Sequence, residues 1–188
     1  MVELWLIRHG QTDWNRQVRY QGQMDIPLNR EGIAQAKAVA KHLNGSKFDA
    51  LYSSDLVRAS RTAGIIADKV GLSVILDPRL REICQGILQG MKPSEVPDKY
   101  PELIEMAKKD YQNWHAPGGE SVRQVAERMA AAANDIARKY PGGKVLVISH
   151  GFALATLVVQ AAKLPLEESY AWIPENAEPF KLAWQGES

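Results

Sequence analysis

Cysteine is almost absent from this chain, because Cys84 is the only one among 188 residues. A single cysteine can form neither an intrachain disulfide nor a cysteine-rich metal site. Low cysteine content is typical of proteins from reducing compartments. We therefore expect a cytoplasmic protein in which Cys84 has a structural role.

The chain also lacks an excess of charge of either sign and any long hydrophobic run. Its 23 basic and 22 acidic residues leave a formal net charge of +1, which gives no reason to expect a nucleic-acid or membrane partner. The longest apolar stretch, residues 152–162, is interrupted by Gln160 and is shorter than the ~20 residues of a membrane span. The apolar residues 2–7 are too few for a signal peptide, so we expect a soluble protein.

Short apolar runs alternate along the chain with amphipathic stretches, and no repeat or linker interrupts them. This alternation predicts an α/β fold, expected here as a three-layer α/β/α sandwich with a mostly parallel central sheet. A length of 188 residues favours a single domain over residues 1–188, since domains commonly have roughly 100–200 residues.

Apolar runs and capping signals set the expected elements. Asn29 and Asp55 stand at helix N-cap positions, and Asn44-Gly45 and Gly71 stand where the same two helices end. The predicted strands are residues 2–7, 50–53, 73–76, 144–149 and 180–184. The predicted helices are residues 30–43, 56–70, 102–113, 121–140 and 152–163.

Two of the four histidines stand in the same context. His9 and His150 each follow an apolar strand and precede a glycine, whereas His42 and His115 fall on an exposed helix face and in a loop. Ligands of open α/β sheets bind beyond the carboxyl ends of the strands. We therefore expect His9 and His150 to share one pocket.

Arg8, directly before His9, bears on what that pocket binds. Histidine is the commonest metal ligand, so a metal-dependent hydrolase using His9 and His150 is one interpretation. A permanent cation beside the ligands would repel a divalent metal but would attract a phosphate, whose geometry suits arginine. The sequence thus favours a phosphate site with no metal.

Further segments occur in a characteristic order along the chain. They are Leu6-Ile7-Arg8-His9-Gly10-Gln11-Thr12-Asp13-Trp14-Asn15, Gly22-x-x-Asp25-x-Pro27-Leu28, Ser53-Ser54-Asp55-Leu56-x-Arg58-Ala59, Leu80-Arg81-Glu82-Ile83, Pro117-Gly118-Gly119-Glu120-Ser121 and Ser149-His150-Gly151. Together they resemble the signature of the histidine phosphatase superfamily, which is also called phosphoglycerate-mutase-like. The resemblance spans nearly the whole chain and implies a mixed sheet with one antiparallel strand.

The resemblance assigns roles to these residues. It implies that His9 is a nucleophile that becomes phosphorylated, with Arg8, Arg58 and His150 around the phosphoryl group and Glu82 as general acid and base. It also implies a substrate-binding set around the phosphate, namely Thr12, Asn15, Gln21 and Gly151. No cofactor or metal is implied, and the partner expected is a small phosphorylated metabolite.

Departures from the family's mutases favour a phosphomonoester hydrolase over a cofactor-dependent phosphoglycerate mutase, which remains the alternative. Mutases of the family have substrate-gripping residues where this chain has Ile83, Gln85 and Pro93, and an asparagine where it has Phe152. They also have a longer insertion after the general acid, which keeps water out. A binding module without catalysis is disfavoured, because both the nucleophile and the general acid are present.

Residues 83–114 are expected to roof the pocket. Their apolar members predict a leaving group with some apolar surface; they are Ile87, Leu88, Met91, Met106 and Trp114. An apolar helix such as residues 152–163 can be buried in the core or in an interface, so a homodimer stays open.

Overall fold

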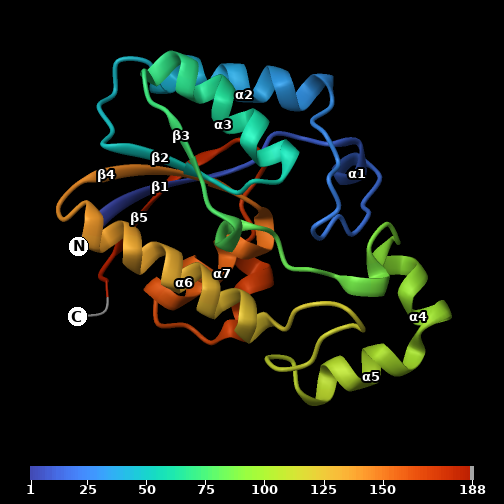
Figure 1. The fold of residues 1–188 in the computed structure, drawn as a ribbon. Helices are drawn as coiled ribbons and strands as arrows, with labels where there is room; N and C mark the ends of the chain where they lie inside the picture. Colours follow the sequence, from blue (N-terminus) through green and yellow to red (C-terminus); the bar gives the residue numbers. More distant parts are fainter. Residues whose placement is uncertain (187–188) are drawn as a thin grey trace.

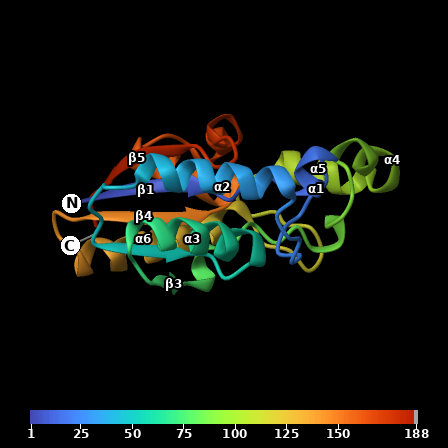
Figure 2. The same ribbon diagram turned by 90° about the horizontal axis from the view of Figure 1, so that it is seen from above.

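A five-stranded sheet is the centre of the computed structural model, which describes residues 1–186 (Figure 1). The strands are β1 (Val2–Arg8), β2 (Ala50–Ser53), β3 (Val74–Leu76), β4 (Lys144–Ser149) and β5 (Pro179–Trp184). Their order is β3-β2-β4-β1-β5, which Figure 2 shows from above. Only β5 is antiparallel to its neighbour, so the expected mixed, mostly parallel sheet is confirmed.

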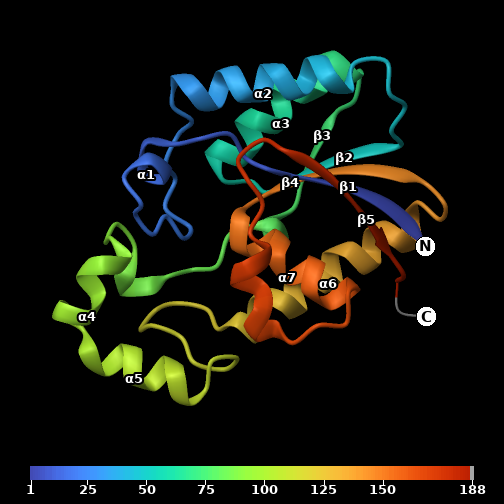
Figure 3. The same cartoon turned by 180° about the vertical axis from the view of Figure 1, so that it is seen from behind.

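Helices cover both faces of the sheet, which makes the three-layer sandwich. The helices are α1 (Asp13–Arg16), α2 (Arg30–Leu43), α3 (Val57–Val70), α4 (Val96–Lys99), α5 (Pro101–Lys109), α6 (Val122–Lys139) and α7 (Gly151–Ala161). Helices α2 and α3 lie together on one face, and α6 and α7 lie on the other (Figures 1 and 3). No helix within residues 1–186 is long and apolar enough to cross a membrane.

The continuous apolar run of β4 is explained by burial on both faces of the sheet. Val145 and Val147 pack into the cluster with α6 and α7, whereas Leu146 and Ile148 pack into the cluster with α2 and α3. Successive side chains of a strand point to opposite faces, so a strand covered on both sides has to be apolar at every position.

The capping of α2 was predicted correctly, but that of α3 was not. Asn29 accepts a hydrogen bond from the Gly32 N–H at 2.8 Å, as expected of an N-cap. Asp55 does not cap α3, because its carboxylate binds the Arg81 guanidinium at 2.5 and 2.7 Å instead. Asp25, which is distant in sequence, accepts the hydrogen bond from the Val57 N–H at the start of α3 at 2.7 Å.

The helix predicted at residues 102–113 is shorter in the structure. Helix α5 ends at Lys109, after which the Asp110 carboxylate accepts hydrogen bonds from the backbone and side-chain nitrogens of Asn113. Such local side-chain bonds compete with helical ones. Helices α4 and α5 lie to one side of the sandwich (Figure 3), around a small apolar cluster of their own.

Candidate active site

The two motif histidines meet at the carboxyl edge of the sheet, as expected. Strands β1 and β4 are parallel neighbours in a register that pairs Arg8 with Ser149. His9 continues this pairing by donating its backbone N–H to Ser149 O at 2.9 Å. The ring centres of His9 and His150 are consequently 5.1 Å apart.

The hydrogen bonds of His9 determine which ring nitrogen can act as a nucleophile. Its Nδ1 lies 2.7 Å from Gly10 O, and a carbonyl only accepts, so the proton is on Nδ1. The lone pair is then on Nε2, where it accepts a hydrogen bond from Arg58 Nε at 3.2 Å. Burial, followed by the charges of Arg58 and Arg8, holds the pKa of His9 well below its usual value. His9 is therefore a neutral imidazole at physiological pH.

Arg58 is a fully buried cation, although an arginine in the first turn of a helix is usually on the surface. Its Nη1 donates to Met24 O and its Nη2 donates to Gly22 O, each at 2.7 Å. A guanidinium has five N–H donors, and the bonds found within residues 1–186 use three of them. The remaining donors and the positive charge are available to an anion.

Arg8 adds a second cation beside His9. Its Nη1 donates to Pro174 O at 2.9 Å, while its Nε is buried and has no partner within residues 1–186. Burial lowers the pKa of both arginines, that of Arg58 to about 10, so both stay charged at neutral pH. Arg58, which is fully buried, and Arg8, which is partly buried, have no carboxylate salt bridge in the described part of the chain and form a binding site for an anion.

His150 is completely buried next to His9 and does not itself line the open pocket. Its Nε2 lies 2.8 Å from Ser54 Oγ, while its Nδ1 is a buried atom with no partner among residues 1–186. Burial and the nearby charge of Arg58 keep the pKa of His150 well below its usual value. A buried polar atom without a partner in a native protein requires an explanation, and a bound phosphoryl oxygen would supply one.

Glu82 is held at the start of α7 rather than in solvent beside Arg79 and Arg81. Its carboxylate accepts hydrogen bonds from the backbone N–H groups of Phe152 at 3.1 Å, Ala153 at 3.0 Å and Ile83 at 2.9 Å. Helix α7 lacks a side-chain cap from its own N-cap residue, so Glu82 fills this role from a distant segment. The carboxyl group thereby lines the same pocket as His9.

The four predicted substrate-binding residues divide into two kinds. Asn15, Gln21 and Gly151 line the pocket, as expected. Thr12 does not line it: its hydroxyl caps α1 by accepting from Asn15 N at 3.1 Å, and it lies 2.9 Å from Gln21 Oε1. The structure therefore gives Thr12 the role of positioning the two amides.

The prediction that residues 83–114 build an apolar roof is wrong for the residues proposed. Leu88, Met91 and Trp114 pack into the separate cluster around α4 and α5, and Ile87 and Met106 are exposed. The apolar wall of the pocket consists instead of Tyr20, Ile83, Phe152, Tyr170 and Ile173.

Three residues of the wall, Tyr20, Tyr170 and Ile173, were missed because they belong to no motif. Tyr170 belongs to the 3₁₀ turn Leu166–Trp172, and its ring centre lies 4.9 Å from that of Phe152. Arg19 and Gln85 also line the pocket and were not predicted as substrate contacts. A spacing pattern cannot reveal these residues, because only the folded loops bring them to the carboxyl edge of the sheet.

The surroundings of the histidines disfavour the metal interpretation. The lone pair of His9 Nε2, which a metal would need, already accepts a hydrogen bond from a cation. Among residues 1–186, no group of three or more histidine, cysteine, aspartate or glutamate side chains is arranged to hold a metal ion.

Comparisons with known proteins show what this chain is similar to. The family model described as histidine phosphatase superfamily (branch 1) matches residues 4–188. A curated protein of Cronobacter sakazakii, named "Probable phosphoglycerate mutase GpmB", is 39% identical over 165 residues, which cover 88% of this chain and 77% of that protein.

Solved structures with similar folds include phosphatases. A mycobacterial glucosyl-3-phosphoglycerate phosphatase is 33% identical, with a TM-score of 0.86 over 96% of this chain and 90% of its own. An alpha-ribazole phosphatase from Shigella flexneri is 25% identical, with a TM-score of 0.86 over 95% of this chain and 89% of its own.

Proposed function

The chain belongs to the histidine phosphatase superfamily, and on this premise we propose that it is a phosphomonoester hydrolase acting through a phosphohistidine on His9. The observation that carries the proposal is the Nδ1–Gly10 O hydrogen bond, which leaves the lone pair on Nε2 in a pocket lined by the cations Arg8 and Arg58. The substrate class is a small phosphorylated metabolite, and the compartment is the cytoplasm.

The first step is attack of His9 Nε2 on phosphorus. The P–N bond forms while the bond from phosphorus to the leaving oxygen breaks, and protonated Glu82 gives its proton to that oxygen. Arg8 and Arg58 bind the phosphoryl oxygens and neutralise their charge. His150 donates a hydrogen bond from Nδ1, the atom that lacks a partner in the described part of the chain.

The second step is hydrolysis of the phosphohistidine. Glu82, now a carboxylate, takes a proton from water as the water oxygen attacks phosphorus and the P–N bond breaks. Inorganic phosphate leaves, and His9 Nε2 regains its lone pair. Every proton transfer uses Glu82, so the cycle needs neither a cofactor nor a metal.

The pocket wall suggests what the leaving group looks like. Tyr20, Phe152 and Tyr170 offer aromatic surface, and Arg19 adds a cation at the same pocket. Aromatic faces stabilise apolar or ring-shaped groups by burial and stacking. We therefore propose a leaving group with an apolar or ring-shaped part.

The test is hydrolysis of p-nitrophenyl phosphate in the presence of a chelator. Wild type should release phosphate, and His9→Ala should abolish it, whereas His42→Ala, on the exposed face of α2, should keep full activity. Acid-labile phosphate should be trapped on wild type and not on His9→Ala. A folded wild type that is inactive in chelator and active with added metal would refute the proposal.

Phosphoglycerate mutase activity is the second candidate, favoured by the 39% identity to the Cronobacter protein named as a probable mutase. A mutase must pass the phosphoryl group to a second substrate before water reaches it. Adding a phosphoglycerate to enzyme that carries a labelled phosphoryl group separates the two activities. A mutase would transfer the labelled group to the phosphoglycerate. We expect release as inorganic phosphate instead, because apolar Ile83 and Phe152 line the pocket.

A further inference from the structure

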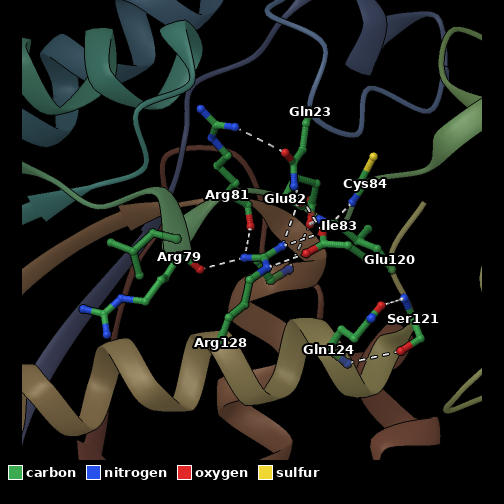
Figure 4. Close-up of polar contacts among 12 residues, drawn as sticks. Gln23, Arg79, Arg81, Glu82, Ile83, Cys84, Glu120, Ser121, Gln124 and Arg128 are labelled. Carbon is green, nitrogen blue, oxygen red and sulfur yellow. Dashed lines mark hydrogen bonds and ion pairs between the residues drawn. The ribbon is translucent and has the colours of Figure 1, made fainter. Parts of the chain in front are cut away.

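The segment that carries Glu82, residues 79–84, has no sheet partner and no helix to hold its backbone beyond the single 3₁₀ turn Pro78–Leu80. Four of its carbonyl groups and one of its N–H groups nevertheless bind one pair of residues, Arg128 and Glu120 (Figure 4). This pair is the subject of the inference, which rests on the proposed role of Glu82 as general acid.

Arg128 binds three carbonyls of this segment from α6. Its Nη1 donates to Arg79 O and to Arg81 O, each at 2.6 Å, and its Nη2 donates to Glu82 O at 3.0 Å. The guanidinium therefore fixes the peptide groups that follow Arg79, Arg81 and Glu82.

Glu120 completes the arrangement from the loop before α6. It accepts hydrogen bonds from Arg128 Nε at 2.9 Å and from Arg128 Nη2 at 3.0 Å, which is the bidentate geometry of a strong ion pair. Its Oε2 also accepts the Cys84 N–H at 2.8 Å, and its own N–H donates to Cys84 O at 2.9 Å. Gln23 Nε2 links Glu82 O and Glu120 Oε2, each at 3.1 Å.

The pair is mostly buried, with 17% of the Arg128 side chain and 23% of the Glu120 side chain exposed, yet neither residue lines the pocket. Burial on its own would raise the pKa of Glu120, but the hydrogen bonds and charge of Arg128 lower it below its usual value. Glu120 is consequently ionised, and the hydrogen bonds of the pair reach the site through the backbone of residues 79–84.

We propose that Arg128 and Glu120 are positioning residues that hold the backbone of residues 79–84 so that the Glu82 carboxyl group reaches the leaving oxygen. Because a glutamate side chain is flexible, the position of the Glu82 carboxyl group, which must contact both the substrate and the start of α7, depends on a fixed backbone. A displacement of about 1 Å in such a group can lower the rate by about 100-fold.

The experiment compares aryl phosphates whose leaving groups differ in acidity. A very acidic phenol leaves without a proton, whereas an ordinary phenol needs one from Glu82. The substrates are 2,4-dinitrophenyl, p-nitrophenyl and phenyl phosphate, and the variants are Arg128→Lys, Glu120→Gln and Glu82→Gln. Lysine keeps the charge but cannot bridge several carbonyls and a carboxylate at once.

We expect Arg128→Lys and Glu120→Gln to reproduce the pattern of Glu82→Gln. On phenyl phosphate kcat/KM should fall by about 100-fold, as for a misplaced catalytic group, with only a small loss on 2,4-dinitrophenyl phosphate. In the double variant Glu82→Gln/Arg128→Lys, the loss of kcat/KM should equal that of Glu82→Gln alone, because Arg128 acts only by positioning the Glu82 carboxyl group.

Two controls separate positioning from stability. Arg123→Lys alters another α6 arginine, whose side chain bonds Asn113 and Gln112 away from the pocket, and should leave all three rates unchanged. Met129→Ala removes a fully buried side chain next to Arg128 and should lower stability without any dependence on the leaving group.

The outcomes distinguish this inference from the proposed function. Equal losses of Arg128→Lys on all three substrates, or no loss, would overturn the inference while the function stands. If Arg128→Lys does not fold, Glu120→Gln is judged by the same criterion. If Glu82→Gln itself shows no dependence on the leaving group, Glu82 is not the general acid, and the function as proposed and this inference both fall.

Discussion

Replacing Ser54 by alanine tests how the site prepares His150 to bind a phosphoryl group. The Ser54 hydroxyl accepts a hydrogen bond from Leu56 N at 3.3 Å, so its own proton is free for His150 Nε2 at 2.8 Å. A proton donated to Nε2 leaves the proton of His150 on Nδ1. Without Ser54, the imidazole can exchange to the other tautomer, which would present a lone pair to the phosphoryl oxygen.

The expected size of the effect follows from the one hydrogen bond that is lost. A net contribution of about 0.5–1.5 kcal/mol corresponds to a roughly two- to tenfold lower kcat. Stability should fall by about 1–3 kcal/mol, because the variant leaves a buried nitrogen unsatisfied. KM should change less than kcat, since the cations Arg8 and Arg58 still bind the phosphate.

The assay is steady-state hydrolysis together with ¹⁵N NMR of the imidazole nitrogens. Wild-type His150 should show a protonated Nδ1, and Ser54→Ala should show a mixture. Ser53→Ala is the matched control, since Ser53 is equally buried but donates to the backbone of Ser54 at 2.8 Å. An unchanged tautomer in Ser54→Ala, or an equal loss of kcat in Ser53→Ala, would show that the hydroxyl does not orient His150.

Two further predictions concern pH and backbone geometry. The pKa of His9 is lowered by burial and by the two nearby arginines, so its ring should show no titration in NMR near its usual value of 6.5. Below about pH 6.5 the His9 imidazole binds a proton in the unfolded chain but not in the folded chain, so its contribution to the free energy of unfolding decreases as the pH falls. An NMR titration midpoint of His9 at 6.5 would contradict the lowered pKa. In chemical denaturation, Gly64→Ala should raise the free energy of unfolding by about 1 kcal/mol, because Gly64 lies within α3 with no atom near an added Cβ. Gly86→Ala should instead lower it by about 1–3 kcal/mol, because Gly86 has φ +50° and an added Cβ would lie 2.1 Å from a backbone oxygen; equal effects of the two changes would refute this difference.

Much of the sheet was predictable, because burial on both faces leaves a plain signal in the sequence. Residues 145–148 are apolar at consecutive positions, and the predicted strand 144–149 is β4 with the same bounds. The order of the strands in the sheet was not predictable, since hydrogen bonding between strands leaves no periodic pattern in the sequence. One antiparallel strand was expected from the family resemblance alone, and only the structure shows that it is β5.

Capping shows where local reasoning fails. Asp55 occupies the position of an N-cap in sequence, but it pairs with Arg81, while Asp25 caps α3 from another segment. A carboxylate binds whichever donors the fold brings near, and an arginine competes well with a backbone N–H. Glu82 is a second example. Its sequence neighbours Arg79 and Arg81 gave no sign that its carboxylate binds the first N–H groups of α7.

The sequence by itself determined the fold class, because apolar runs mark the strands. Through the family resemblance, its ordered motifs also predicted the candidate site residues, namely His9, Arg8, Arg58, Glu82 and His150. Only the tertiary structure decided the rest. It placed the proton of His9 on Nδ1, assigned Thr12 a positioning role, and built the pocket wall from Tyr170 and Phe152. These features depend on contacts between segments far apart in the chain, and such distances are set by packing rather than by spacing in the sequence.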